Sequence, residues 1–311
     1  MLPEVDRYYI AVDGGGSKTE FCLYNLSTMT KKHFFSGSTN FKNPESDTKI
    51  NLIDDGLNQI FQLMKIEPAQ IKGLVMGLSG CDSQEDHDYF MGLAALSGIA
   101  REKIFIGNDC ELAFFSKGKP PGLSVVAGTG SIATGISANC KKARSGGWGS
   151  VVSDEGSGAW IGISVVKDLL RYYDGYGEHR RIFDIIHEHM KERSFDTLQS
   201  QLSKCVVKEL AGFAKLVMDE AAKDDAYCLE LVHTAACLVA EISHSVYQKL
   251  NFSNENSIDI VMTGSLFKSK IFCEAFKENL RDRTNQSNIC YYINNMSPIK
   301  GGITLAQSLF N

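Results

Sequence analysis

Two glycine-turned hairpins of one pattern constrain the fold of this chain more than any other feature. The apolar run YYIAV leads into Gly14-Gly15-Gly16-Ser17, and the apolar run LSVVA leads into Gly128-Thr129-Gly130-Ser131. Apolar residues recur after both turns, so each segment reads as strand, turn and strand. The recurrence predicts two related α/β units, each opening with such a hairpin.

The remaining periodicity and the chain length agree with two α/β domains. The 311 residues correspond to about two domains on a prior of roughly 150 residues each. Short apolar runs predict further strands, and apolar residues at helical spacing predict helices. The strands are expected over 71–78, 104–107 and 258–262, and the helices over 86–98, 158–173, 229–250 and 268–281.

Composition and charge narrow the class of protein. A net charge of -5, a pI near 5.8 and the lack of a basic stripe argue against a nucleic-acid partner. No apolar run approaches the roughly 20 residues of a membrane helix, and the N-terminus lacks a basic, cleavable signal. Nine cysteines without a CxxC pair are typical of reduced thiols. We therefore expect a cytoplasmic protein without a nucleic-acid or membrane partner.

The glycine turns fit neither familiar phosphate loop. Walker A needs Gly-Lys before a helix, whereas Gly16 is followed by Ser17 and a strand-like run. The second turn matches the dinucleotide pattern G-x-G-x-x-A, but a turn at 139–142 leaves no room for the required helix. A dehydrogenase remains one alternative, and glycines that serve only tight turns are another. Two such turns facing each other would donate backbone N–H groups to a chain of phosphates.

Three segments carry a resemblance to a known family: VDGGGSKTEF, VVAGTGSIATG and GGWGSVVSDEGSGAWIG. They are similar to the N-acetylglucosamine kinases, which belong to the BadF/BadG/BcrA/BcrD ATPase family within the actin-like superfamily. The resemblance runs in the family's order over essentially the whole chain. It implies two actin-like (ribonuclease H-like) α/β domains with an interdomain active-site cleft. The N-terminal domain would comprise residues 1–117 and 298–311, and the C-terminal domain residues 118–297.

The resemblance also implies an activity. It is that of a kinase that uses ATP and Mg²⁺ to transfer the γ-phosphoryl group to the 6-hydroxyl of N-acetylglucosamine. N-acetylmuramic acid and glucosamine are alternative acceptors, and a homodimer is expected. A different class within the same family is an ATPase that drives a partner reductase. A non-catalytic sugar sensor would be expected to lose a phosphate loop or the catalytic carboxylate.

Two aspartates are candidates for the chemistry. Asp109 follows the strand 104–107, and α/β sites gather at such strand ends. The family pattern makes it the base that accepts the sugar hydroxyl's proton, with Glu111 as a rival and an ordinary helix N-cap as the alternative reading. Asp13 matches the acidic position of the first phosphate loop and would hold Mg²⁺. A turn-initiating role is the alternative for Asp13.

The other site residues follow from the family motifs. For ATP the resemblance implies Gly14, Gly15, Gly16, Ser17, Gly128, Thr129, Gly130, Gly212, Gly264, Ser265 and Ser269. Lys18 would lend charge at most, because the family does not require a lysine there. For the sugar it implies Asn40, Ser79, Asp109, Ser131, Gly147, Trp148, Gly149 and Asp154. A core position is the alternative for Trp148, and a turn cap is the alternative for Ser79.

Overall fold

The computed structural model describes residues 6–15, 18–37, 52–81, 83–150, 152–191, 194–285, 288–294 and 296–311. The predicted site residues Gly16, Ser17 and Asn40 lie outside the described residues. The chain divides into two compact units: Met1–Lys119 with Asn294–Asn311, and Pro120–Ile293. Each unit has its own five-stranded mixed sheet covered by helices, which confirms the prediction of two α/β units.

The sheet of the first unit has the order β3-β2-β1-β4-β5. Its strands are β1 Tyr8–Gly14, β2 Thr19–Asn25, β3 Lys31–Ser36, β4 Ile71–Leu78 and β5 Ile104–Gly107. The first three strands pair antiparallel, whereas β4 pairs parallel with β1 and with β5. Because β1, β4 and β5 are parallel, their carboxyl ends meet at one edge of the sheet. This edge is where the first glycine turn begins.

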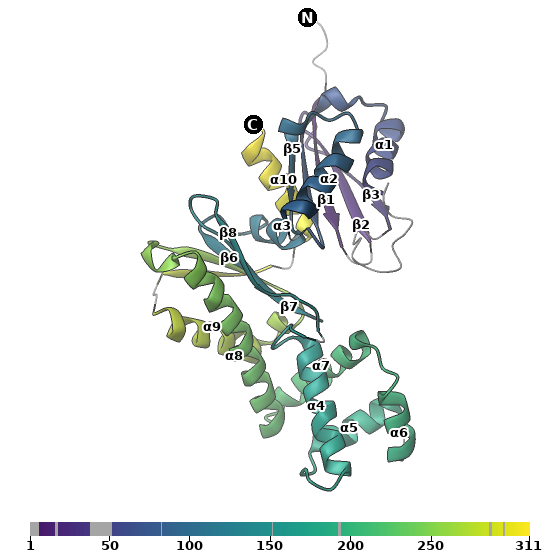
Figure 1. Ribbon diagram of the computed structural model, residues 1–311, viewed down its shortest axis with the longest axis vertical. Helices are drawn as coiled ribbons and strands as arrows, with labels where there is room; N and C mark the ends of the chain where they lie inside the picture. Colours follow the sequence, from purple (N-terminus) through teal and green to yellow (C-terminus); the bar gives the residue numbers. More distant parts are fainter. Residues whose placement is uncertain are drawn as a thin grey trace, which may run out of the picture. The chain divides into compact units, whose positions relative to one another are not determined.

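Helices cover both faces of this sheet, so β1 is buried on both sides. The helices are α1 Leu52–Met64, α2 Gln84–Leu96, α3 Asp109–Phe115 and α10 Pro298–Leu309, with 3₁₀ turns η1 Pro68–Gln70 and η2 Arg101–Lys103. Ile10 and Val12 belong to the core that includes residues of α1 and α2. Tyr9 and Ala11 face the core formed with α3 and α10. In Figure 1 the yellow α10 lies beside the N-terminal strands, although it comes from the far end of the chain.

The second unit repeats this topology. Its sheet has the order β10-β9-β6-β7-β8, with β6 Gly122–Ala127, β7 Ser131–Ile136, β8 Lys142–Gly146, β9 Ile258–Thr263 and β10 Ile289–Ile293. An antiparallel run, β6-β7-β8, again continues into a parallel pair through β9 and β10. Strand for strand this is the order and direction of the first sheet. The predicted internal repeat is therefore present at the level of topology.

The second unit carries more helices than the first. They are α4 Gly158–Tyr173, α5 Arg181–Met190, α6 Phe195–Leu202, α7 Val207–Ala221, α8 Ala226–Lys249 and α9 Lys270–Thr284, with 3₁₀ turns η3 Phe252–Asn254 and η4 Leu266–Lys268. Apolar faces of these helices form one core with β6, β7 and β9. Several ends are capped by side chains, as at Ser157 before α4 and Ser269 before α9.

Helix α8, which the sequence predicted over 229–250, is the longest helix among the described residues. By length and composition alone this helix would suffice to cross a membrane, although no segment of that kind was predicted. Polar residues separate the apolar residues along its sequence, so it contains no long uninterrupted apolar run. Val232, Ala236 and Val239 on its apolar face are fully buried in the core of the second unit.

Gly301 offers a direct test of the close packing between α10 and α3. A Cβ atom added at Gly301 would lie 1.7 Å from the carbonyl oxygen of Leu112. We expect Gly301→Ala to lower the free energy of unfolding by about 3 kcal/mol or more, because backbone atoms must move apart. Urea denaturation followed by circular dichroism would measure the change.

Gly92 provides the matched control in the interior of α2, where an added Cβ would meet nothing within 4 Å. Gly92→Ala should stabilise the protein by roughly 0.5–1 kcal/mol, since alanine loses less backbone entropy. Equal effects of the two substitutions would contradict the packing argument.

Candidate active site

Two carboxylates lie at the carboxyl edge of the first sheet. Asp13 is the penultimate residue of β1, and Asp109 is the first residue of α3, two positions after β5. Both strands pair with β4 in parallel, so the two aspartates are placed at the same edge. The negative charge of Asp109 acts on Asp13 and helps to raise its pKa. The structure thus brings together the residues predicted to be the base and the magnesium ligand.

The environment of Asp13 disfavours a lone negative charge. Burial raises the pKa of its carboxyl from the ordinary value of 3.8 to about 6, with further contributions from Asp109 and Glu20, while Lys18 opposes the shift. Glu20 is the direct cross-strand partner of Asp13, and His33 Nδ1 lies 2.7 Å from Glu20 Oε1. The surroundings therefore favour either a proton or a cation at Asp13.

The carboxylates of Asp13 and Asp109 suit a magnesium ion whose other ligands are water and substrate phosphates. Mg²⁺ is usually bound through one or two carboxylates, with water and substrate phosphates completing its shell. Among the described residues no cluster of three or more His, Cys, Asp or Glu side chains could hold a metal. Asp13 with the neighbouring Asp109 suits this sparse type of site, because a cation would relieve their mutual repulsion.

The residues around Asp109 show which side chain caps the start of α3. Asn108 is the N-cap of α3: its Oδ1 accepts from the backbone N of Cys110 at 3.0 Å. Glu111 completes a capping box, with its Oε1 accepting from the Asn108 backbone N at 3.4 Å. Its side chain also lies against Gly107, where an added Cβ would come within 2.8 Å of Oε2. Asn108 is therefore the N-cap residue of α3, although Asp109 Oδ1 also accepts from the Cys110 N at 2.9 Å, and Glu111 has a structural role.

Ser79 and Gly80 lie beside the first glycine turn. The Ser79 backbone N donates to the Gly14 carbonyl at 2.7 Å, and the Gly15 N donates to the Lys18 carbonyl at 3.0 Å. Gly80 has a φ of 90°, a conformation that favours glycine. The end of β4 is thus tied to the end of β1 through the backbone, and Lys18 extends over the Phe35 ring at 5.4 Å.

The second glycine turn is held by the start of α4. The backbone N atoms of Gly158 and Ala159 donate to the carbonyls of Gly128 and Thr129 at 2.8 and 3.0 Å. A Cβ added at Gly158 would lie 2.9 Å from the Gly128 oxygen. Gly264, with φ 114°, passes the same turn so closely that a Cβ would lie 2.2 Å from the Ala127 oxygen. Only glycine permits these backbone approaches.

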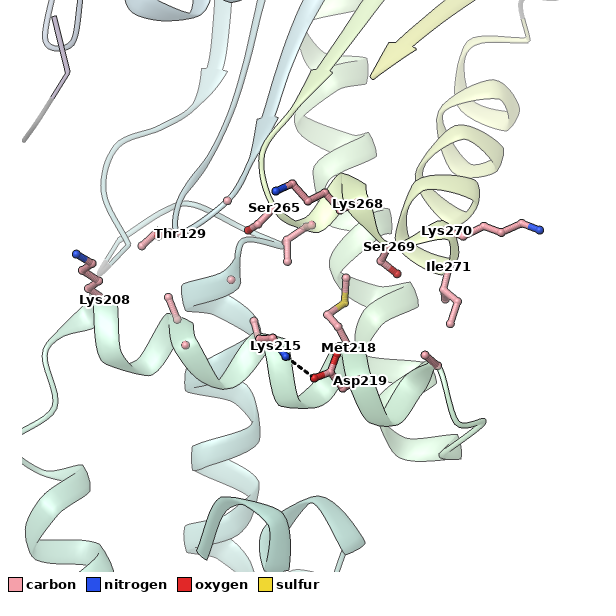
Figure 2. A pocket seen from close by; sticks show the side chains of 17 residues that line it. Thr129, Lys208, Lys215, Met218, Asp219, Ser265, Lys268, Ser269, Lys270 and Ile271 are labelled. Carbon is pink, nitrogen blue, oxygen red and sulfur yellow. Dashed lines mark hydrogen bonds and ion pairs between the residues drawn. The ribbon is translucent and has the colours of Figure 1, made fainter. Parts of the chain in front are cut away.

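A cavity of about 730 Å³ opens beside this turn within the second unit (Figure 2). Five of the residues predicted for ATP line it, whereas Gly130 and Gly264 support the turn without lining the cavity. The predicted residues are Gly128, Thr129, Gly212, Ser265 and Ser269. The sequence prediction missed Gly158, Lys208, Ala211, Ala214, Lys215, Met218, Asp219, Ala222, Leu266, Lys268, Lys270 and Ile271, which also line the cavity.

Two of the predicted sugar ligands, Ser131 and Asp154, form hydrogen bonds that hold the loop after the second hairpin. Ser131 is 2% exposed, and its hydroxyl donates to the Glu155 carbonyl at 2.7 Å. Asp154 is 7% exposed with φ 58°, and its Oδ2 accepts from the Ser150 hydroxyl at 2.9 Å. The same oxygen would lie 2.6 Å from a Cβ at Gly130. The carboxylate of Asp154 therefore contacts the second glycine turn directly.

Arg144 holds the segment around Trp148 through hydrogen bonds and a cation–π contact. Arg144 NH2 donates to the carbonyls of Gly146 and Gly147 at 3.0 and 2.8 Å, and the guanidinium stacks on the Trp148 ring at 4.2 Å. Gly147 and Gly149 have positive φ angles of 72° and 101°. Trp148 is 67% exposed, so the alternative that it is a core residue is wrong. An exposed ring fixed by a cation offers a flat apolar face to a ligand.

Together, the repeated sheet topology and the glycine turns define an actin-like α/β fold. A Streptomyces griseus glucokinase of the ROK family, solved with glucose and AMPPNP, matches with a TM-score of 0.55 at 12% identity, over 97% of this chain and 98% of that one. A candidate N-acetylglucosamine kinase from Chromobacterium violaceum matches with a TM-score of 0.70 at 20% identity, over 97% and 99%. At such identities the likeness shows the fold alone.

The sequence comparison identifies the family. The model of the BadF/BadG/BcrA/BcrD ATPase family matches residues 10–302, and the chain belongs to this family. It is 28% identical to the N-acetylmuramic acid/N-acetylglucosamine kinase of Clostridium acetobutylicum over 281 residues, 88% of this chain and 90% of that one. It is 24% identical to the N-acetyl-D-glucosamine kinase of Dictyostelium discoideum, over 84% and 86%. The family membership predicted from the sequence is confirmed.

The raised pKa of Asp13 predicts a pH-dependent effect on stability. A carboxyl whose folded-state pKa is raised contributes stability below pH 3.8, and that contribution is lost as the pH rises through about 6. Asp13→Asn should therefore stabilise the metal-free protein by about 1–2 kcal/mol at pH 7.5 and by almost nothing near pH 4. Urea unfolding in EDTA across this range would measure the difference.

Glu20→Gln is the control for this prediction, because it removes only a minor cause of the shift. Glu20→Gln should give a fraction of the increase in the free energy of unfolding that Asp13→Asn gives at pH 7.5. A stabilisation by Asp13→Asn that stays constant between pH 4 and 8 would show that the Asp13 charge is not responsible.

Proposed function

We propose that this protein is an ATP-dependent kinase that phosphorylates the 6-hydroxyl of N-acetylglucosamine. One observation supports ATP binding. Residues predicted to bind ATP from distant parts of the sequence, such as Thr129, Gly212 and Ser269, line one cavity. Its volume of about 730 Å³ falls within the roughly 300–1,000 Å³ of small-molecule sites.

The relatives support an amino sugar as the acceptor. Those from Clostridium acetobutylicum and Dictyostelium discoideum are named as kinases of N-acetylated amino sugars, and one from Vibrio cholerae at 22% identity is named glucosamine kinase. N-acetylglucosamine appears in the first two names. N-acetylmuramic acid and glucosamine are the alternative acceptors.

In the proposed reaction Asp109 is the general base. The sugar 6-oxygen forms a bond to the γ-phosphorus while the bond from that phosphorus to the ADP oxygen breaks. Asp109 orients the attacking hydroxyl and accepts its proton. Its place in the first turn of α3, after the Asn108 cap, holds the carboxylate at the edge of the sheet. Glu111 does not compete for this role, because it is part of the capping box.

Asp13 would hold the magnesium ion of the nucleotide. When bound, the ion supplies charge neutralisation for the phosphates. The same carboxyl would otherwise be disfavoured as an anion by burial, by Asp109 and by Glu20. Gly14 and Gly15, with the tie from Ser79 to Gly14, keep the adjacent turn in place for phosphate contacts.

For the sugar we propose Asn40, Ser79, Asp109, Ser131, Gly147, Trp148, Gly149 and Asp154 as the contact set. Trp148 supplies an exposed ring that Arg144 holds in place. Ser131 acts mainly by fixing the Glu155 carbonyl. A homodimer and a cytoplasmic location complete the proposal, and sedimentation velocity would test the former.

The test is an ADP-release assay with Mg-ATP and a panel of acceptors. The panel holds N-acetylglucosamine, N-acetylmuramic acid, N-acetylmannosamine, glucosamine and glucose. We expect N-acetylglucosamine to give the highest kcat/KM. Asp109→Asn should lower kcat by about 10²-fold or more while ATP still binds, since general-base catalysis contributes roughly 10²–10⁴-fold.

The outcomes of this assay separate the alternatives. A preference for N-acetylmuramic acid would keep the kinase and change its substrate. ADP release that does not depend on any sugar would favour an ATPase that serves a partner. Full activity of Asp109→Asn would exclude Asp109 as the base.

Gly212 allows the cavity itself to be tested. It lines the cavity, and a Cβ added there would meet nothing within 4 Å. Gly212→Leu should therefore fill the cavity and weaken ATP binding at least about 10-fold, with little loss of stability. Isothermal titration calorimetry and thermal denaturation would measure both. Unchanged ATP affinity in a folded Gly212→Leu variant would place the nucleotide elsewhere.

A further inference from the structure

The charge of the cavity lining differs from that of the whole chain. Among the described lining residues are four lysines and one aspartate, whereas the chain carries a net charge of -5. The local excess of positive charge attracts an anionic ligand. The family resemblance did not point to any of these lysines.

The lysines are not equivalent. Lys215 Nζ lies 2.7 Å from Asp219 Oδ2, one turn further along α7. Within the part of the chain that the structure describes, Lys208, Lys268 and Lys270 form no ion pair. In Figure 2 Lys208 and Lys268 are drawn on either side of Thr129, while the Lys270 side chain points away from the cavity. Two uncompensated ammonium groups therefore flank the second glycine turn.

The position of Lys208 has an energetic cost without a ligand. It is the second residue of α7, where the helix dipole places a partial positive charge, so a lysine there is electrostatically disfavoured. The same partial positive charge at the start of α7 favours a bound anion. The start of α4 at Gly158 lines the cavity as well. An anion would thus relieve the repulsion at Lys208.

The other end of the cavity has a different character. Met218 and Ala222 lie near the end of α7, and Ile271 lies in the first turn of α9. From Lys208 to Met218 the helix advances about 15 Å, at roughly 1.5 Å per residue. The end near Lys208 therefore carries an uncompensated ammonium group, whereas the other end adds the apolar side chains of Met218 and Ile271 to the paired charges of Lys215 and Asp219. This polarity matches a molecule with an anionic tail and a flat apolar head.

We propose that Lys208 and Lys268 bind the phosphate chain of the nucleotide, with its base directed toward Met218 and Ile271. This assignment rests on the proposed function and adds two binding residues to it. Each ammonium group acts as a mobile point charge that can follow the phosphates. Affinity should consequently rise with the number of phosphates and fall with salt concentration.

The experiment is isothermal titration calorimetry of the full-length protein with ATP, ADP and adenosine, in the presence of Mg²⁺ and without sugar. Lys208→Ala and Lys268→Ala should each weaken ATP binding about 5- to 10-fold, as expected for the loss of one charge-assisted contact. Adenosine binding should stay within about twofold. Lys208→Arg, which keeps the charge, should retain most of the ATP affinity.

Lys167→Ala is the matched control: it removes an exposed lysine from α4 of the same unit that does not line the cavity. Its affinities should equal those of the unchanged protein. Equal ATP affinity in the Lys208→Ala, Lys268→Ala and unchanged proteins would overturn the inference while leaving the kinase proposal intact. Equal losses for ATP and adenosine would also overturn it, by showing a structural effect. Binding of neither ATP nor adenosine to the unchanged protein would overturn both proposals.

Discussion

The backbone contact between the start of α4 and the second glycine turn is the constraint on which the second unit's site depends. Gly158 and Ala159 donate to the carbonyls of Gly128 and Thr129, and Gly264 approaches the same turn from the end of β9. These contacts leave no room for a Cβ at Gly158 or Gly264. They place the turn, the helix start and η4 around one cavity. The glycines are thus required by packing, whatever ligand the turn holds.

Each unit contains a set of charges that its own residues do not balance fully. In the first unit burial, Asp109 and Glu20 oppose ionisation of Asp13. In the second unit the lysines of the cavity outnumber its single carboxylate. A cation would complement the charges around Asp13, and an anionic group would complement the lysines of the cavity.

The sequence predicted the inner strands and the mostly buried edge strand β5 well, and the other edge strands poorly. β1, β4, β6 and β9 are buried on both sides, so their apolar runs stand out. β3, β8 and β10 lie at sheet edges and consist of partly buried and exposed residues. Their polar composition suits an edge, but it resembles that of a loop.

By itself the sequence determined the family, the two-fold repeat and the residues at strand ends, since glycine turns and apolar periodicity act over short distances. It marked Asp13, Asp109, Thr129 and Gly212 for the site. The local pattern Asn-x-x-Glu also suffices to predict that Asn108 caps α3 and that Glu111 completes the capping box. Only the tertiary structure decided that Ser131 is bound to the backbone carbonyl of Glu155. It also gathered the lysines of α7 and η4 around one cavity. These assignments depend on contacts between distant segments, which local sequence patterns do not encode.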